Sequence, residues 1–407
     1  MLTKYKEIFL QKQARSSLFV SIAMMAAIGI IYIWSVFILP IEEEFGWPRN
    51  KISLVFTVTM VCLSSGIAFG GFIHRQVATK KLLAFVICAV TVAIITTSYS
   101  NNLSVMVFCY GAVCGSSMGI VYNLVVYTCN QWFDKDTAAI VSGLLQTCVA
   151  VSTVFLGYLA ATLLEFYDWR TVIRIIGGLL VMSLLLCYKF FRQPYGEETV
   201  SHAVDENVRS FFAGIKPRQM IATKSFWFFC CIRLPILACG IGLLGHSIPF
   251  AIELGISPNN AILALGLFSF CNGLGRTVFG IIWNYAGVKK TVFIDISLFI
   301  ISVAILSFSP LQQNRYTLLL AFALCGFSYG GVILMGVAFT RTVFGLKYFA
   351  ENFGITSITM LVGSFIGPLL FGEIKLITGT YIDALLLFVT CSILSMFFLP
   401  WLKKSAY

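Results

Sequence analysis

The chain has 407 residues, of which 59% are hydrophobic and 11% charged, and its mean hydropathy is +0.91. A soluble domain is typically about 25% charged, so this sequence has too few charged residues to cover a water-facing surface of its size. We therefore predict an all-α, polytopic protein of the lipid bilayer. The net charge of +11 comes from Lys and Arg in short segments between apolar runs, which indicates membrane topology and not a nucleic-acid surface.

The thirteen cysteines and three histidines do not predict a disulfide framework or a metal site. Most cysteines, such as Cys62 and Cys391, lie inside apolar runs, where Cys behaves as a small hydrophobic residue. No Cys-x-x-Cys pair occurs, and the histidines are scattered. No phosphate-binding loop or nucleophile motif is present. We expect no metal, no cofactor, no catalytic residue and no enzyme activity.

The apolar runs predict twelve membrane spans. A basic N-terminal arm precedes the first run, which is too long for a signal peptide and is assigned as a span. A helix needs about 20 apolar residues to cross a bilayer. The predicted spans are residues 17–40, 52–73, 82–99, 103–127, 138–163, 171–191, 225–251, 259–283, 291–309, 316–339, 350–374 and 380–401.

The chain divides into two related halves of six spans each. The one long polar connection, residues 192–224, separates residues 1–191 from residues 225–407. "CGSSMG" at 114–119 recurs as "CGFSYG" at 325–330, and a similar offset places Gly70 opposite Gly280. Two parallel six-helix repeats are typical of a transporter architecture in which the substrate binds near the bilayer midplane between the repeats.

The distribution of basic residues predicts the orientation. Twenty of the 28 Lys and Arg residues lie in segments on the side of the N-terminus, six lie on the other side, and Arg233 and Arg276 lie within spans. Positively charged loops stay on the cytoplasmic side. We expect both termini in the cytoplasm and the protein in the cell's inner (plasma) membrane.

Two loop sequences resemble the signature of the major facilitator superfamily. That signature is Gly, three residues, an acid or amide, then Gly and basic residues. "GIIWNYAGVKK" (280–290) matches it, whereas "GGFIHRQVATKK" (70–81) has His74 in place of Asp and Val77 in place of Gly. The resemblance implies the major facilitator fold. It also implies a gating role for the following residues of the two loops: Gly70, Arg75, Gly280 and Asn284.

Over nearly its full length the chain is similar to the oxalate/formate antiporter family, which overlaps the monocarboxylate porters. The similarity lies in "GIVYNLVVYTCNQWFDKDTAAIVSG" (119–143), "SFWFF" (225–229), "CNGLGR" (271–276) and "AENFGI" (350–355). It implies a secondary transporter of small organic anions that works by alternating access.

Arg276 is the strongest candidate for substrate binding. An arginine at the centre of an apolar helix costs at least ~2.5–3.5 kcal/mol to insert. Its guanidinium is always ionised and matches a carboxylate with two parallel hydrogen bonds. Gly273 and Gly275 precede it and leave room for a ligand. In the family that the chain resembles, an arginine on the eighth helix after an Asn-Gly pair binds the substrate carboxylate.

The alternative for Arg276 is a structural role, either snorkelling to the surface or pairing with an acid. Several residues separate it from either end of its span, which disfavours snorkelling. Pairing is disfavoured because no acidic residue is evident deep in a span. The acids sit at span ends: Glu42 to Glu44, Glu165, Glu253, Glu351 and Glu373. An anionic substrate is therefore the expected partner.

Arg233 is a second basic residue within a span. It lies eight residues after Ser225, about 12 Å along a helix, and Pro235 follows it. Its long side chain could still reach the cytoplasmic face. We favour an interfacial or gating role over contact with substrate.

Met360 bears on the choice of substrate. The resemblance implies that family members handling a dianion carry a lysine eight residues after the Asn of the Asn-x-Gly motif. Here that Asn is Asn352 and the corresponding residue is Met360. One buried cation balances one carboxylate, which favours a monocarboxylate over oxalate.

Further candidates for the lining of the site are aromatic or polar residues at membrane depth. Where the family lines its cavity with aromatics, this chain has Tyr32, Trp34, Tyr122 and Tyr329. Ordinary packing is an equal alternative for Tyr122 and Tyr329 and is favoured for Trp34. Interhelical hydrogen bonding is the alternative for Gln146 and Asn272.

Proton coupling usually needs a titratable group within the membrane, and His246 is the only candidate evident in the sequence. We therefore predict antiport or uniport of monocarboxylates in preference to proton symport. We expect a monomer whose partners are a small carboxylate and the bilayer. The alternatives are an exporter of a larger amphipathic or drug-like anion, and a receptor that binds a metabolite without moving it.

Overall fold

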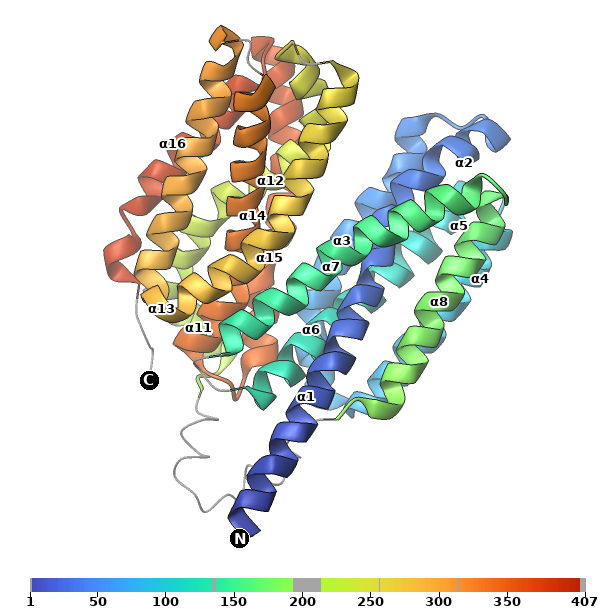
Figure 1. The fold of residues 1–407 in the computed structure, drawn as a ribbon, viewed down its shortest axis with the longest axis vertical. Coiled ribbons are helices and arrows are strands. Elements are labelled where there is room, and N and C mark those ends of the chain that lie inside the picture. Colours follow the sequence, from blue (N-terminus) through green and yellow to red (C-terminus); the bar gives the residue numbers. More distant parts are fainter. Residues whose placement is uncertain (1, 134–136, 193–213, 256, 313–314, 403–407) are drawn as a thin grey trace. The chain divides into compact units, whose positions relative to one another are not determined.

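The computed structural model describes the chain except for residues 1, 134–136, 193–213, 256, 313–314 and 403–407 (Figure 1). The regular secondary structure of the described residues is helical, apart from one isolated bridge between Gly214 and Gly345. Through residue 190 the elements are α1 (Leu2–Ile28), η1 (Gly29–Phe37), α2 (Ile38–Phe45), α3 (Arg49–Gln76), α4 (Thr79–Tyr99), α5 (Leu103–Met106), η2 (Val107–Cys114), α6 (Gly115–Trp132), α7 (Ala138–Leu164) and α8 (Trp169–Phe190). The later elements are α11 (Pro217–Ala222), α12 (Lys224–Glu253), α13 (Pro258–Gln312), α14 (Arg315–Phe344), α15 (Phe349–Thr378), α16 (Ile382–Met396) and η3 (Leu399–Trp401).

The described helices coincide with the twelve predicted spans to within a few residues at their ends. Ten segments among them are long and apolar enough to cross a membrane. One of these, Leu263–Ser307 in α13, covers most of two predicted spans, which are separated at Gly287, where a φ of 73° breaks the helix. The last predicted span corresponds to α16, which has 15 residues, and the short η3 that follows it.

The first helical segment is longer than the predicted span at 17–40. Helix continues without a break from Leu2 through Phe45 and ends at Gly46, whose positive φ suits a helix C-terminus. The basic arm before residue 17 contains no Gly or Pro to stop a helix. Most of the predicted polar linker, residues 193–213, lies outside the described residues.

The chain forms two compact units. Unit 1 comprises Met1–Asp134, Cys148–Ala213 and Phe349–Ile355, and unit 2 comprises Lys135–Thr147, Gly214–Tyr348 and Thr356–Tyr407. The first ten described residues of α7 therefore belong to unit 2, and the first seven of α15 belong to unit 1. The predicted division of the chain at residues 192–224 stays a prediction.

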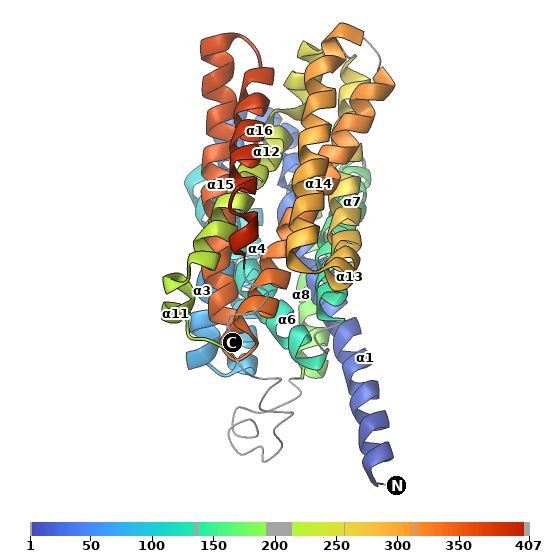
Figure 2. The same ribbon diagram turned by 90° about the vertical axis from the view of Figure 1, so that its left-hand side faces the viewer.

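Within unit 2, glycines bring α13 and α14 into backbone contact (Figure 2). A methyl group added at Gly326 would lie 2.2 Å from the carbonyl oxygen of Phe268, and one at Gly330 would lie 2.1 Å from that of Asn272. Small residues at four-residue spacing are the usual means of close helix approach in lipid. The packing of Gly330 holds α14 directly against the turn of α13 that carries Arg276.

Unit 1 contains two irregular helical segments that touch each other. The 3₁₀-helix η1 and the π-helix η2 meet where the Tyr110 hydroxyl donates to the carbonyl of Ile30 at 2.9 Å, and the rings of Trp34 and Tyr110 lie 4.6 Å apart. Trp34 is fully buried, and its Nε1 donates to the carbonyl of Ile52 at 3.1 Å. Packing, the favoured interpretation of Trp34, is confirmed.

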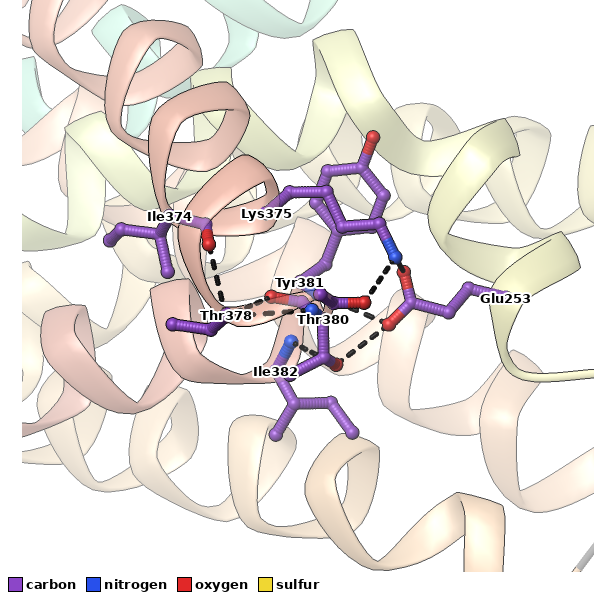
Figure 3. Close-up of polar contacts among 8 residues, drawn as sticks. Glu253, Ile374, Lys375, Thr378, Thr380, Tyr381 and Ile382 are labelled. Atoms are coloured by element: carbon purple, nitrogen blue, oxygen red, sulfur yellow. Dashed lines mark hydrogen bonds and ion pairs between the residues drawn. The ribbon is translucent and has the colours of Figure 1, made fainter.

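A carboxylate ties the end of α12 to the connection between α15 and α16 (Figure 3). Glu253 accepts hydrogen bonds from Lys375 Nζ at 2.7 Å, from Thr380 Oγ1 at 2.7 Å and from the backbone N–H of Tyr381 at 3.1 Å. Burial by itself raises the pKa of Glu253, but these hydrogen bonds together outweigh it and hold the pKa below its usual value.

We expect Glu253→Gln to lower the stability of the purified protein by about 1–2 kcal/mol at pH 7, because hydrogen bonds to a charged group are lost at a partly exposed site. A depressed folded-state pKa stabilises the protein above the unfolded pKa, near 4.3, and this contribution disappears as pH falls through the folded value. Thermal unfolding in detergent should therefore separate the two proteins at pH 7, and the difference should disappear as the pH falls through the folded-state pKa of Glu253. The exposed Glu43→Gln is the control. An equal shift in both variants would contradict the prediction.

Candidate substrate-binding site

Arg276 lies on α13 in unit 2 with only 9% of its surface exposed. Its Nη1 donates to the backbone carbonyl of Gln146 at 2.8 Å, and its Nε faces Asn272 Oδ1 at 3.3 Å, one turn earlier on the same helix. Both partners are neutral. Two neutral acceptors thus orient the guanidinium in a buried setting without compensating its charge. It does not snorkel.

The ion pairs among the described residues do not involve Arg276. They include the pairs of Arg75 with Glu351, Arg170 with Glu44, and Lys375 with Glu253. No hydrogen bond to a described residue engages Nη2 of Arg276. A buried cation without a counterion is costly, and an anionic ligand would remove that cost.

The expectation that no acid lies deep in a span is wrong. Asp295, on the second part of α13, is 1% exposed, and neither oxygen of its carboxyl group has a hydrogen-bond partner among the described residues. It is not the counterion of Arg276. Asp295 is difficult to recognise as a buried acid in the sequence, because it follows Lys289 and Lys290 closely. Charged residues so close together are typical of the end of a span.

Gln146 is completely buried on the part of α7 that belongs to unit 2. Its carbonyl accepts from Arg276, but neither polar atom of its side-chain amide has a partner among the described residues. The interhelical hydrogen bond considered as the alternative is therefore made by the backbone of Gln146 and not by its side chain. A buried amide without partners can hydrogen-bond a ligand or a water molecule.

Two threonines at the same place were not predicted from the sequence. Thr147 Oγ1 donates to the carbonyl of Gly273 at 2.6 Å and lies 2.8 Å from Thr277 Oγ1. Each is the next residue after a predicted site residue, Gln146 or Arg276. The four-residue spacing of Gly273 and Thr277, which puts them on one face of α13, was the signal available in the sequence.

The structure brings together three of the predicted binding residues: Arg276, Asn272 and Gln146. Tyr329, 5% exposed, packs against Gly240 and stacks on Phe268. Met360 is half-buried in unit 2. Their contact with a ligand stays a prediction.

Two predicted tyrosines belong to unit 1. Tyr122 is 8% exposed and stacks on Phe353 with ring centroids 6.3 Å apart. Tyr32 is half-buried in η1. Their membership in one site with Arg276 stays a prediction.

Arg233 is 2% exposed, so its side chain does not reach an aqueous face. It donates to the carbonyls of Val332 and Thr356, at 3.1 Å each, and to Thr359 Oγ1 at 2.7 Å. These contacts join α12, α14 and α15 within unit 2. They give Arg233 a structural function, and a gating function stays a prediction.

The predicted gating loops make close contacts within each unit. Arg75 Nη1 lies 3.2 Å from Glu351 Oε1 in unit 1, while His74 pairs with Thr79 Oγ1 at 2.8 Å. Arg75, the neighbour of His74 in the sequence, thus makes a charge contact with α15. Gating itself stays a prediction.

The glycines of the two loops lie against neighbouring helices. Gly70 of α3 packs on Ile120 and Asn123 of α6, and an added methyl at Gly280 would lie 2.7 Å from the carbonyl oxygen of Ala139. Asn284 is half-buried. His246, the predicted titratable candidate, has Nε2 3.2 Å from the carbonyl of Pro368.

The long apolar helices and the buried guanidinium define an integral membrane protein with a candidate anion site. The model of the Major Facilitator Superfamily matches residues 19–251 and 236–406. The chain belongs to this superfamily and has its fold of twelve helices in two halves. It is a transporter of that class.

Several curated relatives resemble the chain over most of its length. An uncharacterized MFS-type transporter, YhjX, of Escherichia coli is 21% identical and covers 83% of this chain and 82% of its own. The oxalate:formate antiporter of Oxalobacter formigenes is 21% identical over 80% and 76%. Monocarboxylate transporter 12-B of Danio rerio is 22% identical over 81% and 73%.

A solved transporter has the same fold. The crystal structure of FucP, in the outward conformation, superposes with a TM-score of 0.72 at 12% identity and covers 96% of this chain and 99% of that chain. At this identity the likeness concerns the fold alone.

Proposed function

We propose that the protein is a secondary transporter of small organic monocarboxylates. The observation that carries the proposal is the buried guanidinium of Arg276, whose hydrogen-bond partners in the described chain are neutral oxygens. Two similar proteins, named for oxalate and formate and for monocarboxylates, support the same substrate class. Both termini would lie in the cytoplasm of a cell whose plasma membrane holds the protein.

The geometry of Arg276 suggests how a carboxylate would bind. Asn272 and Gln146 hold Nε and Nη1, which leaves Nη2 for a ligand. A carboxylate that binds two guanidinium nitrogens side by side would take Nη2 and compete with the Gln146 carbonyl for Nη1. Binding would therefore loosen α7 from α13. In an alternating-access cycle this exchange of acceptors links occupancy of the site to helix movement.

The charge of the site favours a monocarboxylate. A dianion would bring one uncompensated charge into a buried site, which is costly. A monocarboxylate would leave the site near neutral. The half-buried Met360 on α15 is the position at which a second cation would change this balance.

We expect Met360→Lys to shift selectivity towards dicarboxylates such as oxalate and to weaken monocarboxylate transport about tenfold, because the added cation lacks a partner in that complex. Met and Lys have similar lengths, so little packing should be lost. Inhibition of labelled uptake by formate, acetate, lactate and oxalate measures the effect. Met360→Gln, which is polar and uncharged, is the control. An unchanged rank order in a folded, active variant would place residue 360 away from the site.

The direct test of the function is uptake by purified protein in liposomes. Vesicles preloaded with an unlabelled monocarboxylate should take up the labelled compound faster than empty vesicles do. A receptor would bind ligand without saturable uptake. An exporter of larger amphipathic anions would respond to those compounds and not to lactate or formate. Absence of counterflow with every small carboxylate would contradict the proposal.

The energy source of transport depends on whether a titratable acid lies within the membrane. Antiport and uniport were favoured over proton symport because no titratable acid was evident within the membrane. Asp295 is a buried acid within a segment long and apolar enough to cross a membrane, so proton symport is no longer disfavoured.

A further inference from the structure

Asp295 is an acid in a setting where a negative charge has no compensation. Both carboxyl oxygens are inaccessible and have no hydrogen-bond partner among the described residues. The hydroxyl of Ser328 lies beside this residue and donates to its backbone carbonyl at 3.3 Å. The second part of α13 begins at Val288, directly after the break at Gly287. Asp295 lies seven positions later, about 10 Å along this helix from its start.

An uncharged surface of α14 lies against this carboxyl group. A methyl group added at Gly331 of α14 would lie 2.8 Å from Asp295 Oδ1 and 2.5 Å from Phe279 Cδ2. The carboxyl group and the Phe279 ring therefore both pack against Gly331. Among the described residues, the ion pairs do not include Asp295. Burying an ionised carboxylate without a partner costs far more than burying the neutral acid.

We infer that Asp295 is a proton-binding site that couples the transport cycle to a proton. The identity of the cotransported substrate rests on the proposed function, whereas the proton site rests on the burial of Asp295 alone. In the conformation described here the carboxyl group is neutral. Acids inside membrane spans that lack a structural partner are characteristic of proton pathways.

Two adjacent glycines of α14 provide the link between Asp295 and the substrate site. Gly330 lies against the backbone of Asn272 and Arg276, and Gly331 lies against Phe279 and Asp295. A shift of the Arg276 helix along α14 would move Phe279 and expose the carboxyl group to water, where it ionises. One proton on Asp295 and one carboxylate on Arg276 would thus cross together without net charge.

The first test detects the proton directly and does not depend on transport. At pH 7 exposed carboxyl groups are ionised, so a protonated carboxyl band in the infrared spectrum of the purified protein must come from a buried acid. We expect such a band in the wild type and its loss in Asp295→Asn. A spectrum without the band, or a band that persists in the variant, would overturn the assignment.

The second test separates proton coupling from substrate transport. An inward proton gradient should drive wild-type vesicles to accumulate labelled monocarboxylate at least about fivefold. Asp295→Asn should lose accumulation and keep counterflow within about twofold of the wild type. Accumulation by Asp295→Asn equal to that of the wild type would overturn the coupling, as would wild-type counterflow without any response to the gradient. Wild-type vesicles without counterflow would contradict the proposed function, and the infrared test would still decide the proton site.

If Asp295→Asn does not fold, Asp295→Glu keeps the coupling testable. It retains the titratable group and should shift the pH dependence of accumulation without abolishing it. A pH profile identical to that of the wild type would count against the assignment.

Discussion

Arg276→Gln is expected to abolish monocarboxylate uptake, with a loss of at least about 100-fold. Removing one member of a buried, hydrogen-bonded charge pair costs about 2–5 kcal/mol, and each 1.4 kcal/mol is a factor of ten. The amide nitrogen of glutamine takes the position of Arg276 Nε, so it can still donate to Asn272 Oδ1, while the hydrogen bond to the Gln146 carbonyl is lost. Removal of an uncompensated buried charge offsets that loss, so the variant should still fold. Initial uptake rates in liposomes, at equal amounts of folded protein, measure the effect.

Two further variants show whether the charge or its shape is responsible. Arg276→Lys keeps the charge but not the fork of parallel donors, so we expect it to recover only part of the activity. Arg218→Gln removes an exposed arginine of α11 and should transport normally. Wild-type rates in the Arg276→Gln protein would rule out Arg276 as the carboxylate site.

Gly330→Val is expected to cause the second large effect, a loss of both stability and transport. Even the first carbon of the new side chain would lie 2.1 Å from the carbonyl oxygen of Asn272, and 3.1 Å from the backbone nitrogen of Arg276. Neither backbone atom can rotate away, so α13 and α14 must separate. Overpacking of this kind costs about 1–3 kcal/mol or more. The temperature of thermal unfolding and the rate of counterflow should both decrease.

The control for Gly330 lies on α13. Gly266 has no heavy atom within 4 Å of the position of an added methyl group, so Gly266→Val should change stability little. If both valine variants behaved alike, the backbone contact between α13 and α14 would not be important for the site.

The twelve spans could be predicted because the solvent is lipid, and a helix that crosses it must be apolar for about 20 residues. The break at Gly287 between two of them could be placed only to within a few residues. Nothing in the sequence indicated that α7 and α15 would each contribute to both compact units. Those assignments depend on contacts between distant segments, to which a local hydropathy pattern is insensitive.

The site was predictable where a residue contrasted with its surroundings. An arginine inside an apolar run is conspicuous, and its lack of an acidic partner holds among the described residues. Thr147 and Thr277 were missed because threonine is common in membrane helices and changes hydropathy little. Asp295 was missed because its burial results from packing against α14, whereas its distance from Lys290 suggests the end of a span.

The binding of a labelled monocarboxylate to purified protein tests the central claim most directly, because it isolates the ligand from the transport cycle. The wild type should show one saturable site that is competed by unlabelled substrate. Arg276→Gln should bind at least about 100-fold more weakly, while its thermal unfolding stays near that of the Arg218→Gln control. Equal affinity in the wild type and a folded Arg276→Gln protein would contradict the assignment of the carboxylate to Arg276.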